Sequence, residues 1–237
     1  MAALPKHLVL DDVLARGDVW RGNTLASLPV ASIASGFSLL DEALPGQGWP
    51  RGNLTEVLVD RCGLGELTLV LPALAQLSAA GGWVALVAPP YLPYAPAWRD
   101  AGLLPERLVV VQPRKDLPWC VEQLLACGGF SAVLAWPGEG IDTRSLRRLQ
   151  VAAEGQPVFA LLWRSTAAAV VPSPAPLRLL VDCGEQGLLV SILKRRGRPA
   201  SRPILLAVPR PGRRPDVVVG PAFSVSGSRS AAVSAIA

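Results

Sequence analysis

Three features of the sequence predict an α/β fold, in which a mostly parallel sheet flanked by helices is followed by C-terminal antiparallel strands and a disordered basic tail. Short apolar runs alternate with amphipathic stretches between Leu54 and Trp163. This alternation is typical of βαβ units whose sheet is covered on both faces. After Trp163, three β-rich runs are separated by polar turns, and beyond Pro209 the chain is rich in Pro, Gly, Ser and Ala.

The expected elements follow from these patterns in chain order. An N-terminal extension, 1–35, contains one short helix near 8–15, and the α/β domain spans 36–208. In LDEALPGQGWPRG a helix stops at Pro45 and Gly46, and a turn leads into the first core strand. We expect core strands at 54–59, 83–87, 107–111, 131–136 and 157–163, and helices near 65–81, 116–127 and 142–154.

The C-terminal part of the domain is expected to be an antiparallel meander that closes one edge of the sheet. Its strands are LRLLVDC, GLLVSILKR and RPILLAV, with turns at CGEQG and RRGRPAS. Residues 209–237 have neither helical nor strand periodicity and are expected to be disordered.

The composition argues against several classes of protein. Hydrophobic residues make up 51% of the 237 residues, but no run approaches the roughly 18 apolar residues of a membrane helix. The N-terminus has no export signal, so we expect a cytoplasmic protein that does not enter membranes. The chain has one histidine and four cysteines without CxxC spacing, which indicates reduced thiols and no metal, cofactor or conventional catalytic triad.

The positive charge is concentrated near the C-terminus. Residues 1–187 hold 14 Lys and Arg against 17 Asp and Glu, whereas residues 188–237 hold 9 against 1. The segment is either a solvated basic end or a contact for DNA phosphates or an acidic partner. The candidate contact residues are Lys194, Arg195, Arg196, Arg198, Arg202, Arg210, Arg213 and Arg214.

The stretch LTEVLVDRCGLGELTLVL has the strand, turn and helix layout of a phosphate-binding loop. Gly63 and Gly65 could present backbone N–H groups to a phosphate, but Glu66 holds the lysine position and Thr68 comes one residue later than the magnesium-binding hydroxyl. The turn is therefore either a degenerate phosphate loop or an ordinary strand-to-helix connection. A carboxylate facing a triphosphate is repulsive, so we expect no useful ATP affinity.

The segment from ASGFSLLDEALPGQGWPRGNLTEVL through GGWVALVAPP to FSAVLAWPGEG resembles the RecA core as it enters its ATP site. In that family the strand after the first helix leads to a catalytic glutamate, a position that falls here at about Pro89. The next core strand ends in a magnesium-supporting aspartate, a position that falls here at about Trp136. Together with Glu66, these replacements predict an abandoned active site without ATPase activity.

Over about residues 52–164 the pattern is similar to the SulA inhibitors and to the ImuA family. The N-terminal segment VWRGNTLASLPVASIASGFSLLDEALPGQGWPRG and the continuation LRLLVDCGEQGLLVSILKRRGRPASRPILLAV favour ImuA. This resemblance implies an accessory protein of SOS-induced translesion DNA synthesis that scaffolds ImuB and an error-prone replicative-type polymerase. RecA and, through the basic segment, non-specific DNA are further candidate partners.

Two other functions stay open: a SulA-type inhibitor that blocks FtsZ assembly, and a recombination protein with residual ATP binding. The stretches PGEGIDTRS and RSTAAAVVPSPAP occupy the places of the RecA loops that line the DNA channel, but they are short and poor in Lys and Arg. DNA binding of the RecA filament type is therefore not expected through them.

The carboxyl end of the sheet is expected to serve as a protein contact if the nucleotide site is lost, because α/β folds usually bind ligands there. For LDEALPGQGWPRG the alternatives are a structural turn that feeds the first strand and a docking surface that includes Trp49. The candidate partner-contact residues are Trp49, Tyr91, Leu92, Tyr94 and Trp98.

Overall fold

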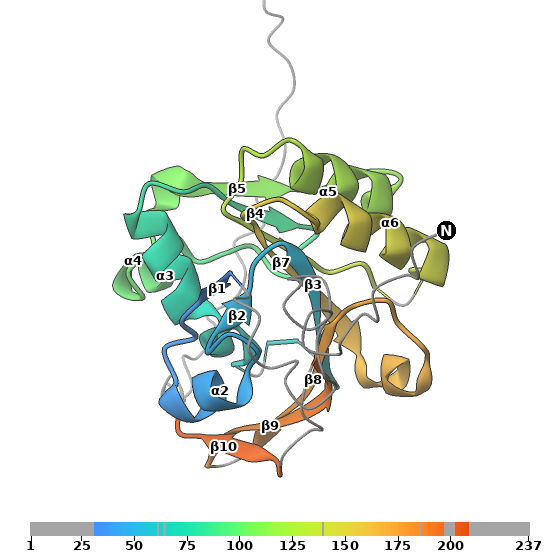
Figure 1. The fold of residues 1–237 in the computed structure, drawn as a ribbon. Coiled ribbons are helices and arrows are strands. Elements are labelled where there is room, and N and C mark those ends of the chain that lie inside the picture. Colours follow the sequence, from blue (N-terminus) through green and yellow to red (C-terminus); the bar gives the residue numbers. More distant parts are fainter. Residues whose placement is uncertain are drawn as a thin grey trace, which may run out of the picture.

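The computed structural model describes residues 31–60, 62–63, 65–138, 140–184, 186–196 and 202–208. The helix expected near 8–15 and the tail 209–237 lie outside these residues, as does most of the N-terminal extension. The described chain is built around one large twisted sheet with helices on both faces (Figure 1).

The eight strands of this sheet are β3 (Asn53–Val59), β4 (Val84–Val87), β5 (Leu108–Val111), β6 (Ala132–Ala135), β7 (Phe159–Ser165), β8 (Leu177–Gly184), β9 (Gly187–Lys194) and β10 (Ile204–Leu206). Their spatial order is β10-β9-β8-β3-β7-β6-β4-β5. Strands β3 to β8 pair in parallel, while β8, β9 and β10 pair with one another antiparallel. The mostly parallel sheet and the C-terminal meander predicted from sequence are both confirmed.

Strand β8 belongs to both parts of the sheet. It begins the antiparallel meander, yet it pairs in parallel with β3 at the centre of the sheet. A second sheet, of two short antiparallel strands, was not predicted and consists of β1 (Ser32–Ile33) and β2 (Trp49–Pro50). The helix Ser38–Ala43 lies between these two strands in the sequence.

The helices are α2 (Ser38–Ala43), η2 (Glu66–Leu69), α3 (Leu71–Ala79), α4 (Ala95–Asp100), η3 (Pro105–Arg107), α5 (Leu117–Ala126), α6 (Thr143–Ala153) and η4 (Thr166–Val170). The single helix expected near 65–81 is divided into a 3-10 turn, η2, and α3. Pro72 lies in the first turn of α3, where its missing N–H is tolerated. The two helices expected near 116–127 and 142–154 are confirmed, and Asp116 and Asp142 cap them by accepting hydrogen bonds from Trp119 and Ser145.

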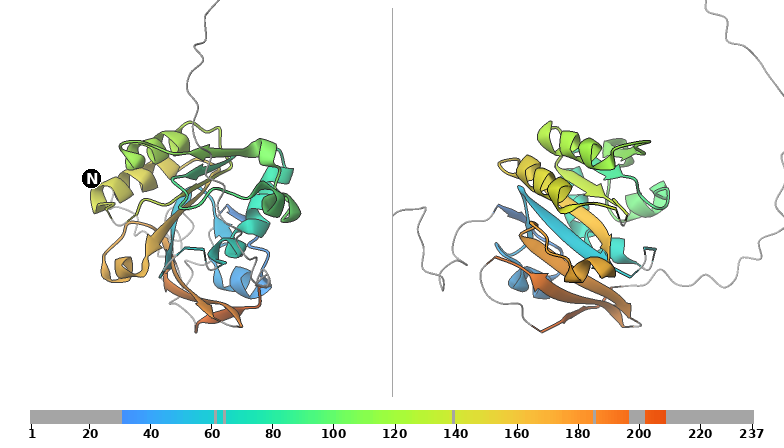
Figure 2. Two further views of the ribbon diagram at one scale, coloured as in Figure 1. Left: turned by 180° about the vertical axis from the view of Figure 1, so that it is seen from behind. Right: turned by 90° about the vertical axis from the view of Figure 1, so that its right-hand side faces the viewer.

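Alternate residues of the central strands enter two separate cores, one on each face of the sheet. Val57, Leu86, Leu134 and Leu161 pack with α2 and α3, whereas their neighbours on the opposite face pack with α5 and α6. The side-on view shows α5 and α6 lying together over one face (Figure 2). Burial of both faces explains why the strands are nearly continuous apolar runs.

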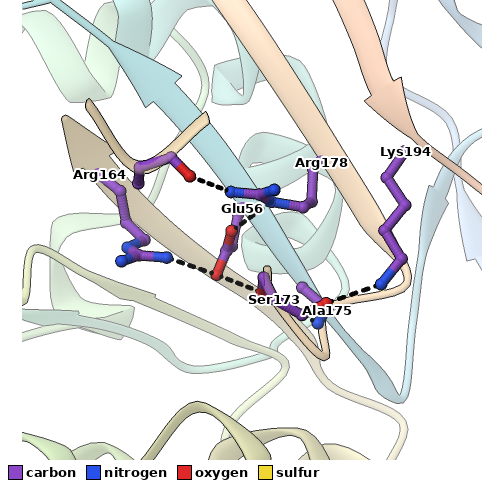
Figure 3. A network of polar contacts seen from close by, with 7 residues as sticks. Glu56, Arg164, Ser173, Ala175, Arg178 and Lys194 are labelled. Atoms are coloured by element: carbon purple, nitrogen blue, oxygen red, sulfur yellow. Dashed lines mark hydrogen bonds and ion pairs between the residues drawn. The ribbon is translucent and has the colours of Figure 1, made fainter. Parts of the chain in front are cut away.

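One buried network interrupts this apolar pattern where three strands meet (Figure 3). Glu56 of β3 is fully buried and accepts hydrogen bonds from Arg164 Nη1 at 3.0 Å and Arg178 Nε at 2.7 Å. Ser173 donates to the same carboxylate at 2.7 Å, and Arg178 Nη2 donates to the carbonyl oxygen of Ala168 at 2.6 Å. The network therefore fastens the 166–176 segment onto the sheet.

Candidate functional site

A pocket of about 180 Å³ lies at the carboxyl ends of β3, β4 and β6. The turn that follows β3 and the loop between β4 and α4 both line it. The pocket brings together nine of the residues that the sequence singled out, namely Gly63, Gly65, Glu66, Pro89, Tyr91, Leu92, Tyr94, Trp98 and Trp136. The position agrees with the general rule for ligand sites in α/β sheets.

The carboxylate of Glu66 fills part of the cradle that the turn forms. The backbone N–H of Gly63 donates to Glu66 Oε1 at 2.9 Å and to Oε2 at 3.0 Å, and the Glu66 residue is only 3% exposed. A backbone N–H in such a turn is the kind of donor that would hold a phosphate oxygen. Here the protein supplies the anion from its own chain.

The hydroxyl of Thr68 is also directed to the turn itself, because Oγ1 donates to the carbonyl oxygen of Gly65. Gly63 has φ +89°, and Gly65 has φ +98°. A Cβ atom added at Gly63 would lie 3.2 Å from Cε2 of Tyr91, so the tyrosine ring packs directly over the turn. Glycine at this position thus serves both the backbone conformation and the approach of the ring.

Trp136 directly follows β6, Pro89 lies two residues after the end of β4, and both line the pocket. The Trp136 ring stacks on Trp163, with centroids 6.1 Å apart and planes 18° apart. Trp136 also lines a neighbouring pocket of about 270 Å³, together with Cys62 and Trp163. One indole therefore forms a wall of both pockets.

The negative charge of Glu66 acts on the nearby thiol of Cys62. Burial is the main factor that raises the pKa of Cys62, and the carboxylate of Glu66 raises this pKa further. The indole N–H of Trp136 has the smallest effect and lowers it. Cys62 is consequently held towards the neutral thiol.

The candidate partner-contact residues divide into an exposed and a buried group. Tyr91, Leu92 and Tyr94 are 67%, 81% and 70% exposed and surround the mouth of the pocket. Trp98 is buried and forms an inner wall. Trp49 is fully buried against Phe159, with ring centroids 5.6 Å apart, so its interpretation as part of a docking surface is wrong and the structural alternative holds.

The basic segment begins as part of the sheet. Lys194 ends β9 and donates to the carbonyl oxygen of Ser173 at 2.7 Å, and its pKa is lowered, mainly by burial and then by Arg178. Arg195 donates to the carbonyl oxygen of Ala43, which ties the strand end to α2. Arg196 and Arg202 are exposed, and the remaining candidates, Arg198, Arg210, Arg213 and Arg214, lie outside the described residues.

The Glu56 network was missed by the sequence reasoning, although a signal was present. A charged residue lies within each apolar strand, in LTEVLV, in the continuation of PVFALLW and in LRLLVDC. A charged side chain inside a fully buried strand requires a partner of opposite charge. The one acid and the two arginines in these three strands could therefore have been predicted to pair with one another. The stretch RSTAAAVVPSPAP, compared above with a DNA-channel loop, supplies Ser173 to this network.

The sheet order, with a glycine turn at the carboxyl end of its strands, defines a mostly parallel α/β protein, and its sequence is similar to that of RecA over about half of the chain. The chain belongs to the family described as the MT3502 N-terminal domain, whose model matches residues 42–165. It is 32% identical over 113 residues to "Protein RecA 1" of Myxococcus xanthus, which is 48% of this chain and 31% of that protein. It is 34% identical over 129 residues to "Protein RecA" of Chlorobaculum parvum, which is 53% of this chain and 37% of that protein.

The matched stretches thus span only about a third of the curated RecA proteins. Among solved structures, SulA from Pseudomonas aeruginosa is matched at 28% identity and a TM-score of 0.39, over 47% of this chain and 97% of SulA. None of the helices in the described part of the chain has the length and apolar character needed to cross a membrane.

Proposed function

We propose that this chain is a non-catalytic RecA-like accessory protein of damage-tolerance DNA synthesis, of the ImuA type. It assembles ImuB and an error-prone replicative-type DNA polymerase through protein contacts, and it neither binds nor hydrolyses ATP. The RecA-like similarity supports the class, and the ImuA-like sequence segments support the role.

The observation that carries the proposal is the contact between the Glu66 carboxylate and the Gly63 N–H. A nucleotide phosphate would have to displace the carboxylate from this donor and would then meet its negative charge. Two like unit charges about 4 Å apart repel by roughly 4 kcal/mol at an effective dielectric constant near 20. A lysine at the same position would attract the phosphate by a similar amount, so the replacement reverses the sign of the interaction.

The surroundings of the turn support the same conclusion. Pro89 and Trp136 replace side chains that would activate water and support magnesium in the resembling family, and neither can ionise as a carboxylate does. Exposed Tyr91, Leu92 and Tyr94 lie at the mouth of the pocket. Exposed aromatic and apolar side chains at a concave site are typical of protein contacts.

Nucleotide binding provides the first test. The full chain is titrated with ATP and magnesium in a calorimeter. We expect no binding with a Kd below about 1 mM, which corresponds to a binding free energy of roughly −4 kcal/mol. A RecA protein treated in the same way is the positive control. Micromolar ATP binding would overturn the proposal and would favour a residual ATP-binding recombination protein.

Partner binding provides the second test. The full chain, mixed with purified ImuB and with the polymerase at low and moderate salt, should retain at least one of them in a pull-down. The same preparation should leave FtsZ polymerisation unchanged. Inhibition of FtsZ assembly without retention of ImuB or polymerase would replace the proposed role with that of a SulA-type division inhibitor.

A further inference from the structure

The pocket beside Glu66 combines a buried carboxylate with aromatic rings on several sides. Glu66 lies in the pocket wall and is 3% exposed. Tyr91, Tyr94, Trp98 and Trp136 line the same pocket. None of the pocket-lining residues in the described part of the chain is Lys or Arg.

These groups favour a cationic guest. A cation is attracted by the faces of aromatic rings, most strongly by Trp and Tyr, and this attraction grows when water is excluded. A carboxylate in the same cavity adds a charge-assisted hydrogen bond. Phosphate, the usual guest of a glycine turn, would be repelled by the same carboxylate.

The position of Tyr91 links the two parts of this site. Its ring packs over Gly63, whose N–H donates to both oxygens of Glu66. The Glu66 carboxylate and the Tyr91 ring therefore both contact Gly63.

We propose that this pocket binds the guanidinium group of an arginine side chain that a partner protein presents beside apolar residues. A guanidinium is planar, stacks on aromatic rings and donates several hydrogen bonds in a fixed fork, which suits a narrow aromatic cavity better than a compact ammonium does. Leu92, Tyr91 and Tyr94 are exposed around the mouth and provide apolar contact for the residues that flank the arginine. The inference rests on the proposed function, because only a protein without nucleotide leaves this cavity to a partner.

The test uses the full chain and small probes followed by calorimetry and by NMR of the Trp indole N–H signals. N-acetyl-arginine amide should bind with a Kd of about 1 mM, and the neutral isostere N-acetyl-citrulline amide should bind at least about tenfold more weakly. The peptide N-acetyl-Leu-Arg-Leu amide should bind at least about tenfold more tightly than the single arginine, because it adds apolar contact at the mouth. Equal binding of the citrulline and arginine probes would overturn the inference.

Variants locate the site. Glu66→Gln keeps the shape of the side chain and should weaken arginine binding at least about tenfold, and Tyr94→Leu should weaken it about threefold to tenfold. Glu106→Gln, at an exposed acid outside the pocket, should leave binding unchanged. Circular dichroism checks that each variant is folded. If Glu66→Gln does not fold, the inference is tested by Tyr94→Leu, because substitution at this exposed position should leave the fold intact, and unchanged arginine binding in that variant would overturn the inference.

Three further outcomes bear on this inference and on the proposed function. Tighter binding of spermidine than of the leucine-flanked arginine peptide would overturn the partner assignment, because the pocket would then select free polyamines. Absence of arginine binding with ATP binding also absent would overturn the inference and leave the non-catalytic accessory role in place. Binding of ATP would overturn both.

Discussion

Glu66 shows how one residue changes the chemistry of a turn without changing its backbone. The strand, the glycines and the following helical turn are all present, and the Glu66 carboxylate accepts the Gly63 N–H. Its identity was readable from the sequence. Its position against Gly63 and its burial were not, because side-chain orientation depends on the loop that packs over it.

The reactivity of the Cys62 thiol can be used to test the effect of the Glu66 charge. In a variant with Cys120, Cys127 and Cys183 changed to Ser, Glu66→Gln should lower the pKa of Cys62, because the carboxylate raises it in the native chain. More thiolate would then be present at pH 8, and alkylation by iodoacetamide should be about twofold to fivefold faster. The rate is measured by mass spectrometry over time.

Glu106→Gln in the same cysteine background is the matched control, since this acid is exposed and pairs with Arg99. It should leave the alkylation rate of Cys62 unchanged. If Cys62 reacts no faster with Glu66→Gln than in the same cysteine background with Glu66 intact, the assigned direction is contradicted.

The central strand β3 depends on its buried ion network. Glu56→Gln would leave the guanidinium groups of Arg164 and Arg178 buried without their carboxylate, and both side chains are only 7% exposed. We expect the free energy of unfolding to fall by about 3–5 kcal/mol, as is typical when one partner of a buried pair is removed. Urea denaturation followed by circular dichroism measures the change.

Glu122→Gln supplies the comparison, because Glu122 pairs with Arg148 on the surface of α5 and α6. Its loss should change stability by less than about 1 kcal/mol. Equal effects of the two substitutions would mean that the Glu56 network does not hold the 166–176 segment as described.

Gly187 determines how β10 closes the sheet. It has φ +134°, and a Cβ atom there would lie 2.1 Å from the carbonyl oxygen of Leu206. Gly187→Ala should therefore displace β10, reduce stability by about 1–3 kcal/mol and speed hydrogen exchange of the amides in 204–206. Mass spectrometry of peptides from this region measures the exchange.

Gly81→Ala is a suitable control, because Gly81 also has positive φ, +82°, but a Cβ there meets no heavy atom within 4 Å. Its cost should be limited to backbone strain of about 1 kcal/mol. Exchange in 204–206 should stay as in the native chain, and faster exchange there in the control would remove the steric explanation.

The whole molecule has its positive charge at one end of the sequence. The full chain should bind duplex DNA without sequence preference, and its affinity should fall as salt rises. Changing Arg210, Arg213 and Arg214 to Gln should lower the salt slope by up to about 0.9 for each phosphate interaction that the substitutions remove. Fluorescence anisotropy with a labelled duplex at several salt concentrations measures this slope.

Changing Arg99, Arg144 and Arg147 to Gln alters the net charge equally but at exposed positions on α4 and α6. This control should bind DNA nearly as well as the native chain. Identical slopes for the two triple variants would assign DNA binding to overall charge and not to the C-terminal segment.

The sequence by itself determined the element types, the parallel core, the antiparallel meander and the loss of the lysine at the glycine turn. These features follow from local periodicity and residue identity, which are properties of short stretches of chain. It also singled out Tyr91, Leu92 and Tyr94 as candidate contacts at the carboxyl end of the sheet, because α/β folds usually bind ligands there.

Only the tertiary structure decided which tryptophans are buried, how β8 joins the two halves of the sheet and that Glu56, Arg164 and Arg178 form one network. Trp49 looked available in a Pro- and Gly-rich turn, but the small β1-β2 sheet places it against Phe159. These outcomes depend on contacts between residues far apart in the chain, where burial and charge pairing are set by packing that no local pattern records.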